Sequence, residues 1–131
     1  MERTVLIVED DPQNLKLFSD LLQVKGYSAL VATNGRQGVE IGKEKKPDLI
    51  LMDIQMPVMD GLEALTILKA DETTKEIPVV ALTAYAMQGD AERLGGAGFD
   101  GYITKPIDIK EFFNKLAEYT LKGPGAQEEH R

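Results

Sequence analysis

The chain contains no cysteine, and its single histidine, His130, is the penultimate residue. Without thiols it can form neither a disulfide framework nor a thiolate zinc site, and it has no cysteine nucleophile. Catalysis by a Ser-His-Asp or Cys-His arrangement needs a histidine inside the fold. These absences exclude disulfide-stapled domains, thiolate zinc proteins and the histidine-dependent hydrolases.

Long apolar runs and an excess of basic residues are also missing. No uninterrupted apolar run exceeds four residues, whereas a membrane-spanning helix needs about 20. A strand-like run begins within four residues of Met1, so no signal peptide is expected. The 22 acidic residues outnumber the 15 basic ones, giving a formal charge of −7, which disfavours direct binding to nucleic acid or anionic membrane. We expect a cytoplasmic chain of one domain.

Short apolar runs alternate with segments of helical periodicity. Strands are expected at residues 5–8, 28–32, 48–53, 78–83 and 102–104. Helices are expected from 12 to about 25, from 35 to 45, after Asp60, from 87 to 97 and from 108 to 121. This alternation predicts an α/β fold, a parallel sheet with helices on both faces. The domain is expected to span residues 1–122, and the polar segment 123–131 is predicted to be a flexible tail.

Three of the expected helices carry residues at the spacing of one helical face. The first follows Asp11-Pro12, which predicts an N-cap and a proline at the first helical position. The residues at helical spacing are Leu15, Phe18 and Leu22 in the first helix, Leu62, Leu65 and Leu68 in the third, and Ile109, Phe113, Leu116 and Thr120 in the last.

Acidic residues stand where two of the predicted strands end. Glu9 and Asp10 follow the first strand, and Asp53 closes the third. Ligands of open parallel sheets bind beyond the carboxyl ends of the strands, and in the flavodoxin-like order 2-1-3-4-5 these two strands are neighbours. Three crowded carboxylates repel one another, and a hard cation such as Mg²⁺ or Mn²⁺ would relieve the repulsion. The alternative is that these acids end the strands by chance; Asp11 is interpreted as a helix cap alone.

Two further strands end next to side chains with functional groups, at the same edge of the predicted sheet. Thr83 closes the fourth strand and Lys105 follows the fifth. Taken singly, threonine is a common strand residue and lysine is usually a solvated surface charge. Together with the acids they predict a crevice with a metal site, a nucleophilic carboxylate, a hydroxyl and a cation. Such a set suits phosphoryl transfer to a carboxylate.

Four spaced motifs resemble those of the receiver domain of bacterial two-component response regulators, the chemotaxis-regulator-like fold. They are VED at 8–10, MDIQMPVMDG at 52–61, LTA at 82–84 and YITKP at 102–106. The resemblance covers residues 3–122 and implies a three-layer αβα fold with five helices and strand order 2-1-3-4-5. Within the family the chain is most similar to the stand-alone cell-cycle regulators of the DivK type, through residues 46–55 and 105–107.

The resemblance implies a role for each residue of the crevice. Asp53 would be the phosphoacceptor. Mg²⁺ would be bound by Asp10, Asp53 and the backbone carbonyl of Gln55, while Glu9, an aspartate in many relatives, would act through water. Lys105 would pair with the phosphoryl group, with a cis peptide bond to the following proline.

A second set of implications concerns switching and partners. Thr83 and Tyr102 match the switch pair, and residues 87–97, 102–104 and 108–121 would form the surface that a downstream protein target reads. The phosphoryl donor would be a sensor histidine kinase or a histidine phosphotransfer protein. The protein would be a signalling monomer or weak dimer rather than an enzyme, with Mg²⁺-dependent self-phosphorylation and slow self-dephosphorylation at Asp53. The position of the first strand and the short tail favour a stand-alone regulator.

Three alternatives compete with this interpretation. A phosphatase of the haloacid-dehalogenase type would carry a second aspartate two residues after the nucleophile, where this chain has Gln55. An adaptor with the receiver fold would bind partners without being phosphorylated, which the complete set of site residues argues against. A nucleotide-binding fold is disfavoured because neither phosphate-binding glycine motif occurs.

Overall fold

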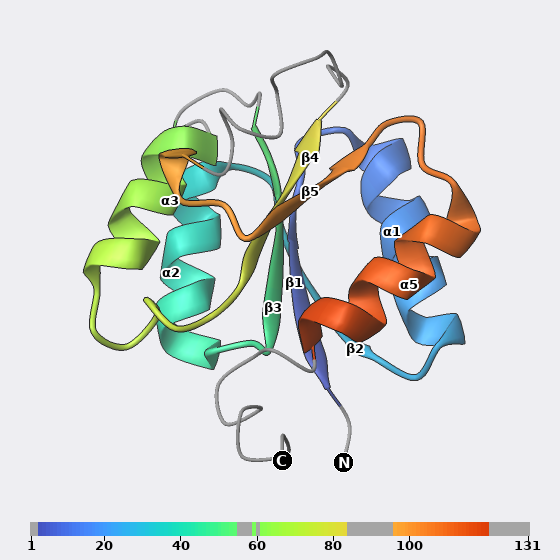
Figure 1. Ribbon diagram of the computed structural model, residues 1–131, viewed down its shortest axis with the longest axis horizontal. Helices are drawn as coiled ribbons and strands as arrows, with labels where there is room; N and C mark the ends of the chain where they lie inside the picture. The colour runs from blue at the N-terminus through green and yellow to red at the C-terminus, as the bar shows by residue number, and fades with distance from the viewer. Residues whose placement is uncertain (1–2, 55–58, 60, 84–95, 121–131) are drawn as a thin grey trace.

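The computed structural model describes residues 3–54, 59, 61–83 and 96–120, and these form three layers with a parallel sheet in the middle (Figure 1). The sheet order is β2-β1-β3-β4-β5, as predicted. The strands are β1 (Thr4–Val8), β2 (Ser28–Ala32), β3 (Leu49–Asp53), β4 (Val79–Thr83) and β5 (Gly101–Thr104).

Helices cover both faces of this sheet. They are α1 (Pro12–Val24), α2 (Gly35–Lys45), α3 (Gly61–Ala70) and α5 (Ile109–Thr120). Helices α2 and α3 lie on one face, and α1 and α5 on the other (Figure 1). The predicted helix at 87–97 falls mostly on residues outside the described part. Among the described helices, none has the length and apolar character needed to cross a bilayer.

The sheet separates two apolar clusters because alternate strand residues point to opposite faces. Leu6 and Val8 pack toward α2 and α3, whereas Val5 and Ile7 pack toward α1 and α5. Strands β1, β3 and β4 are central and buried on both sides, which explains their unbroken apolar runs. The register aligns Val8 with Met52 and Asp53 with Leu82, so the carboxyl ends of these strands share one edge.

Helix α1 begins as the sequence predicts. The Asp11 side chain accepts a hydrogen bond from the Gln13 N–H at 3.1 Å, and Pro12 is the first helical residue. Phe18 and Leu22 are fully buried on the side that faces the sheet. The local capping chemistry and the apolar spacing therefore agree on where this helix starts and which side it buries.

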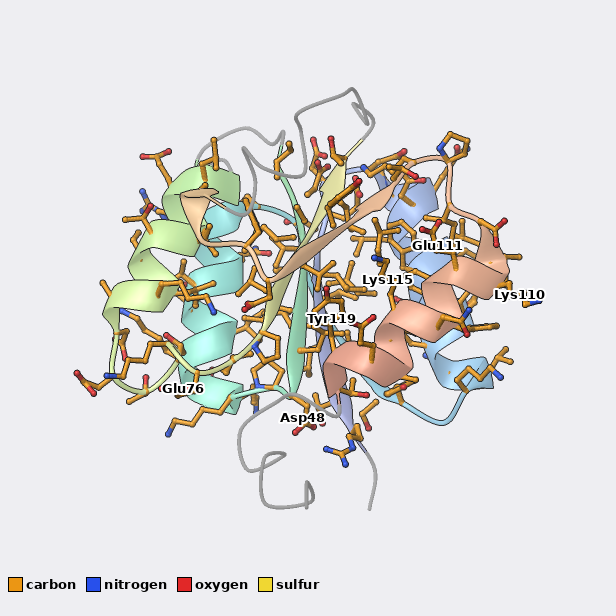
Figure 2. All side chains as sticks on the ribbon, viewed as in Figure 1. Asp48, Glu76, Lys110, Glu111, Lys115 and Tyr119 are labelled. Atoms are coloured by element: carbon orange, nitrogen blue, oxygen red, sulfur yellow. The ribbon has the colours of Figure 1, made fainter. Side chains whose placement is uncertain are left out.

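The buried faces of α3 and α5 differ from the prediction. Leu62 is exposed although Leu65 and Leu68 are buried. In α5, Ile109 is 52% exposed and Phe113 is only half-buried. The sheet-facing side of α5 is made instead of Phe112, Leu116, Tyr119 and Thr120, while Lys110 and Glu111 point to solvent (Figure 2).

Asp100 ties several elements together at the amino ends of the strands, opposite the acidic residues. Its carboxylate accepts hydrogen bonds from the Val79 N–H at 2.8 Å and from Lys69 Nζ at 3.1 Å. Its backbone carbonyl accepts the Tyr119 hydroxyl at 3.0 Å, between α5 and the strands (Figure 2). One residue thus joins α3, β4 and α5 at the start of β5.

Lys46, the C-cap residue directly after α2, has a left-handed backbone with φ of 49°. This conformation disfavours a residue with a Cβ atom, so Lys46→Gly should raise the free energy of unfolding by roughly 1 kcal/mol. Chemical denaturation measures the change. Lys45→Gly, inside the last turn, is the control and should lower stability by about 1 kcal/mol. A loss in both variants would contradict the prediction.

Candidate functional site

Three carboxylates meet at the carboxyl ends of β1 and β3. Glu9 and Asp10 follow β1, Asp53 ends β3, and one oxygen from each lies within 4.8 Å of the others. Glu9 is 1% exposed and Asp53 6% exposed, whereas Asp10 is exposed. The predicted crowding of these three side chains is confirmed, and Asp10 is the member that solvent reaches.

Lys105 places a cation against this cluster. Its Nζ lies 2.9 Å from Glu9 Oε1 and 3.4 Å from Asp53 Oδ2. Its backbone N–H donates to the Thr83 carbonyl at 2.8 Å, and its peptide bond to Pro106 is cis, as predicted. The Lys105 ammonium therefore extends from the end of β5 to Asp53 and Glu9 at the ends of β3 and β1. The positions of these residues at their strand ends predict this proximity.

Glu9 is held from two sides. Its second oxygen accepts the Asp11 N–H at 3.2 Å, while the first accepts the Lys105 ammonium. The Glu9 N–H donates to the Ala32 carbonyl at 3.0 Å, which extends the pairing of β1 with β2. These contacts hold both oxygens of the Glu9 carboxylate, one by Lys105 and the other by the Asp11 backbone.

Burial and pairing shift two pKa values in this site. Burial raises the pKa of Glu9, the Asp53 charge raises it further, and the contacts with Lys105 only partly offset this, so it stays above its ordinary 4.5. Burial by itself lowers the pKa of Lys105. The hydrogen bond to Glu9 and the charges of Asp53 and Glu9 outweigh burial and hold this pKa above 10.5. Lys105 is therefore a permanent cation at neutral pH.

Thr83 and Tyr102, the predicted switch pair, lie on the neighbouring strands β4 and β5. Thr83 is buried at the end of β4. Tyr102 pairs with Ala81, two residues before Thr83, and packs against the cluster under α2 and α3. Its ring is half-buried, with Lys115 Nζ 5.9 Å from the centroid. Gln55, the other predicted site residue, lies outside the described part of the chain.

Gly61 is a site residue whose importance the sequence reasoning missed. A Cβ atom at Gly61 would lie 2.6 Å from the Asp53 carbonyl oxygen and 2.7 Å from Ile54 Cα. The first turn of α3 therefore packs directly on the backbone that carries the Asp53 carboxylate. A glycine that opens a helix soon after a strand-ending acid is the signal that could have indicated this contact.

The chemistry of the donor set suits a hard divalent cation. All three acidic side chains offer oxygen ligands, and the described site contributes neither nitrogen nor sulfur ligands. Mg²⁺ and Mn²⁺ prefer such ligands, and an exposed residue such as Asp10 leaves room for the waters that Mg²⁺ retains. The arrangement also places a cation beside a buried carboxylate, a combination that suits phosphoryl transfer.

Comparisons with known proteins agree with this geometry. The sequence profile of the response regulator receiver domain matches residues 5–117. The polar-differentiation response regulators DivK of Brucella anthropi and Brucella abortus are each 44% identical over 119 residues, covering 91% of this chain and 97% of theirs.

Solved structures show the same fold. The receiver domain of a sensor histidine kinase from Pseudomonas aeruginosa, solved with a magnesium ion coordinated in its active site cleft, is 34% identical with a TM-score of 0.84. The alignment covers 92% of this chain and 98% of that one. The chemotaxis protein CheY4 of Vibrio cholerae is 25% identical with a TM-score of 0.84, covering 91% and 99%.

Proposed function

The chain belongs to the response regulator receiver family of two-component signalling, and on that premise we propose that Asp53 accepts a phosphoryl group from a phosphohistidine. The donor is a sensor histidine kinase or a histidine phosphotransfer protein. The position of Asp53 carries the proposal. This carboxylate ends a central strand, is 6% exposed, and lies between two acids and a lysine.

The transfer uses the Asp53 carboxylate as nucleophile. One of its oxygens forms a bond to phosphorus while the phosphorus–nitrogen bond of the donor breaks, and the imidazole nitrogen keeps the electron pair and takes a proton from solvent. Lys105 contributes a fixed positive charge 3.4 Å from Asp53 Oδ2. That charge stabilises the negative charge spread over the phosphoryl oxygens, which is where most of the catalysis in such transfers arises.

We assign Mg²⁺, or Mn²⁺, to the acidic cluster. Asp10 and Asp53 would bind the ion directly together with the backbone carbonyl of Gln55, and Glu9 would act through water. When bound, the ion neutralises negative charge on the oxygens around the transferred phosphoryl group. The pairing of Glu9 with Lys105 at 2.9 Å supports an indirect role for Glu9, because this carboxylate already has a cationic partner.

The response to phosphorylation is assigned to Thr83 and Tyr102. The Thr83 hydroxyl moves toward a phosphoryl oxygen and the Tyr102 ring turns inward. The link between the Lys105 N–H and the Thr83 carbonyl supports coupling of β4 to β5. Residues 87–97 with β5 and α5 would then present a changed surface to a downstream protein. We place the chain in the cytoplasm as a signalling monomer or weak dimer.

An apolar pocket beside Lys105 supports a protein donor. It has a volume of about 140 Å³ and lies between α1 and the segment that follows β5. Leu17, Phe18 and Ile107 contribute apolar walls, and Leu17 is 42% exposed. A side chain of the donor protein can fill this pocket while its phosphohistidine faces Asp53.

The test is incubation with a small acyl phosphate and Mg²⁺, followed by intact mass spectrometry. We expect a single phosphoryl adduct on the wild-type chain and no adduct on Asp53→Asn, because the amide lacks the nucleophilic oxygen charge. Asp20→Asn, at an exposed acid on α1, is the matched control and should form the adduct. Unmodified wild-type protein in the presence of active donor would support the adaptor alternative instead.

A further inference from the structure

A second pocket lies at the amino ends of the strands, opposite the acidic cluster. Its volume is about 300 Å³, which is in the range of small-molecule sites. Its walls come from the end of α3, the loop between α3 and β4, the residue before β5, and α5 (Figure 2). The lining residues are Lys69, Lys75, Glu76, Pro78, Asp100 and Tyr119.

The Lys69 ammonium in this pocket is already occupied. It donates to the Ile77 carbonyl at 2.9 Å, to Asp100 Oδ2 at 3.1 Å and to the Lys75 carbonyl at 3.3 Å. These three acceptors match the three protons of an ammonium group. Lys69 therefore contributes a fixed charge that Asp100 balances, and a ligand must bind through the other lining groups.

Two carboxylates in the pocket still have oxygens to offer. Asp100 Oδ2 accepts the Lys69 ammonium and the Val79 N–H, whereas Asp100 Oδ1 has no hydrogen-bond partner among the described residues. The Glu76 carboxylate is exposed and likewise has no hydrogen bond or ion pair within the described ranges. The pocket thus presents anionic acceptors to a ligand that carries several hydrogen-bond donors.

The remaining lining suits a flat group and an anion. Pro78 and Tyr119 supply ring surfaces, and a planar cation packs well along an aromatic ring. Lys75 pairs with Glu72 at 3.0 Å, but Glu72 is 84% exposed, so a ligand carboxylate can compete for this lysine. The two lysines and two acids of the lining balance, and Glu72 adds one negative charge. A ligand of net positive charge therefore fits the pocket.

We propose that this pocket binds a small zwitterion with a guanidinium group, of the chemical class of free arginine. The guanidinium lies between Glu76 and Asp100, along the Tyr119 ring, and the ligand carboxylate meets Lys75. A guanidinium offers five donors in one plane and can serve two carboxylates at once, whereas an ammonium offers three donors. The formal charge of −7 on the chain also attracts such a ligand. The proposal is independent of the chemistry at Asp53.

The test is an NMR titration of the isotope-labelled full chain with L-arginine at constant ionic strength. The amides of Lys75, Glu76 and Asp100 should shift and saturate with a dissociation constant of about 1 mM, as an open polar site allows. The Glu9 amide, at the opposite end of the sheet, should not move. L-citrulline replaces the guanidinium by a neutral ureido group and should bind at least about tenfold more weakly. Agmatine lacks the carboxylate and should bind about threefold more weakly.

Glu76→Gln should weaken arginine binding about tenfold, because a neutral amide replaces one carboxylate. Glu40→Gln, at an exposed acid on α2, is the matched control and should bind arginine as the wild-type chain does. Equal affinity for arginine and citrulline would overturn the proposal. So would the absence of a saturable shift up to about 10 mM arginine, or shifts that Glu76→Gln leaves unchanged.

Discussion

Lys105→Met is expected to lower the free energy of unfolding by about 3 kcal/mol at neutral pH in buffer without divalent cations. The substitution leaves Glu9, which is 1% exposed, without its ammonium partner and beside the Asp53 carboxylate. Breaking a buried ion pair by removing one partner is costly because an uncompensated charge remains. Denaturant unfolding monitored by circular dichroism measures the loss.

Two further variants separate the buried pair from a general charge effect. Lys16→Met removes an exposed lysine paired with Asp20 at 3.0 Å and should change stability by less than about 0.5 kcal/mol. Lys105→Met combined with Glu9→Gln should recover most of the loss, because the more deeply buried Glu9 charge is then absent and Asp53 no longer lies beside a second carboxylate at that position. Equal losses for Lys16→Met and Lys105→Met would contradict this account.

The deficit of Lys105→Met should also depend on pH. Since the folded-state pKa of Glu9 lies above 4.5, ionising Glu9 costs stability as the pH rises above that value. Removing Lys105 takes away contacts that lower this pKa, so the cost grows. We therefore expect the deficit to be largest near neutral pH and to shrink as Glu9 is protonated. In the wild-type chain the contribution of the Lys105 charge is fully present below pH 10.5 and is lost as the pH rises through the raised pKa of Lys105.

Gly61→Ala should impair both stability and phosphorylation. The added methyl group would meet the backbone of Asp53 and Ile54 at 2.6 and 2.7 Å, and backbone gives way less readily than the end of a side chain. We expect a loss of about 2 kcal/mol from overpacking. We also expect phosphorylation to be about tenfold slower, because the Asp53 carboxylate is displaced.

Gly96→Ala is the matched control for Gly61→Ala. A Cβ atom at Gly96 would meet nothing within 4 Å, so stability and the phosphorylation rate should stay at or above the wild-type values. Stability is measured by denaturation and the rate by intact mass over time. If Gly61→Ala keeps the wild-type stability and phosphorylation rate, the start of α3 tolerates displacement from Asp53 and the prediction is wrong.

The sheet and the grouping of the site residues follow from local signals in the sequence. Unbroken apolar runs identify β1, β3 and β4 as central strands, and parallel pairing brings their carboxyl ends to one edge. Glu9 and Asp53 come next to such runs and Lys105 follows β5, so their proximity follows from the strand order. The pairing of Lys105 with Glu9 at 2.9 Å, closer than with Asp53, depends on side-chain reach and burial, which sequence spacing does not specify.

The buried side of α5 illustrates a limit of periodicity. Phe112 and Phe113 both lie at helical spacing from Leu116, and the prediction chose Phe113 together with Ile109. The structure buries Phe112, whose ring stacks on Phe18 of α1 at a centroid distance of 5.6 Å. Contact with a residue nearly a hundred positions away decided between two locally equivalent patterns. The close approach of Gly61 to Asp53 was missed for the same reason, since it exists only once α3 is docked.

Because of Asp100, the two ends of the sheet should tolerate mutation to different degrees. Its bonds to Val79, Lys69 and Tyr119 hold the amino ends of the strands, far from Asp53. Part of the resistance to unfolding therefore resides at an end that is remote from the proposed phosphoryl chemistry. Substitutions near Asp53 leave the hydrogen bonds at this opposite end in place. Natural variation can adjust signalling speed at one end while the other end preserves a folded protein.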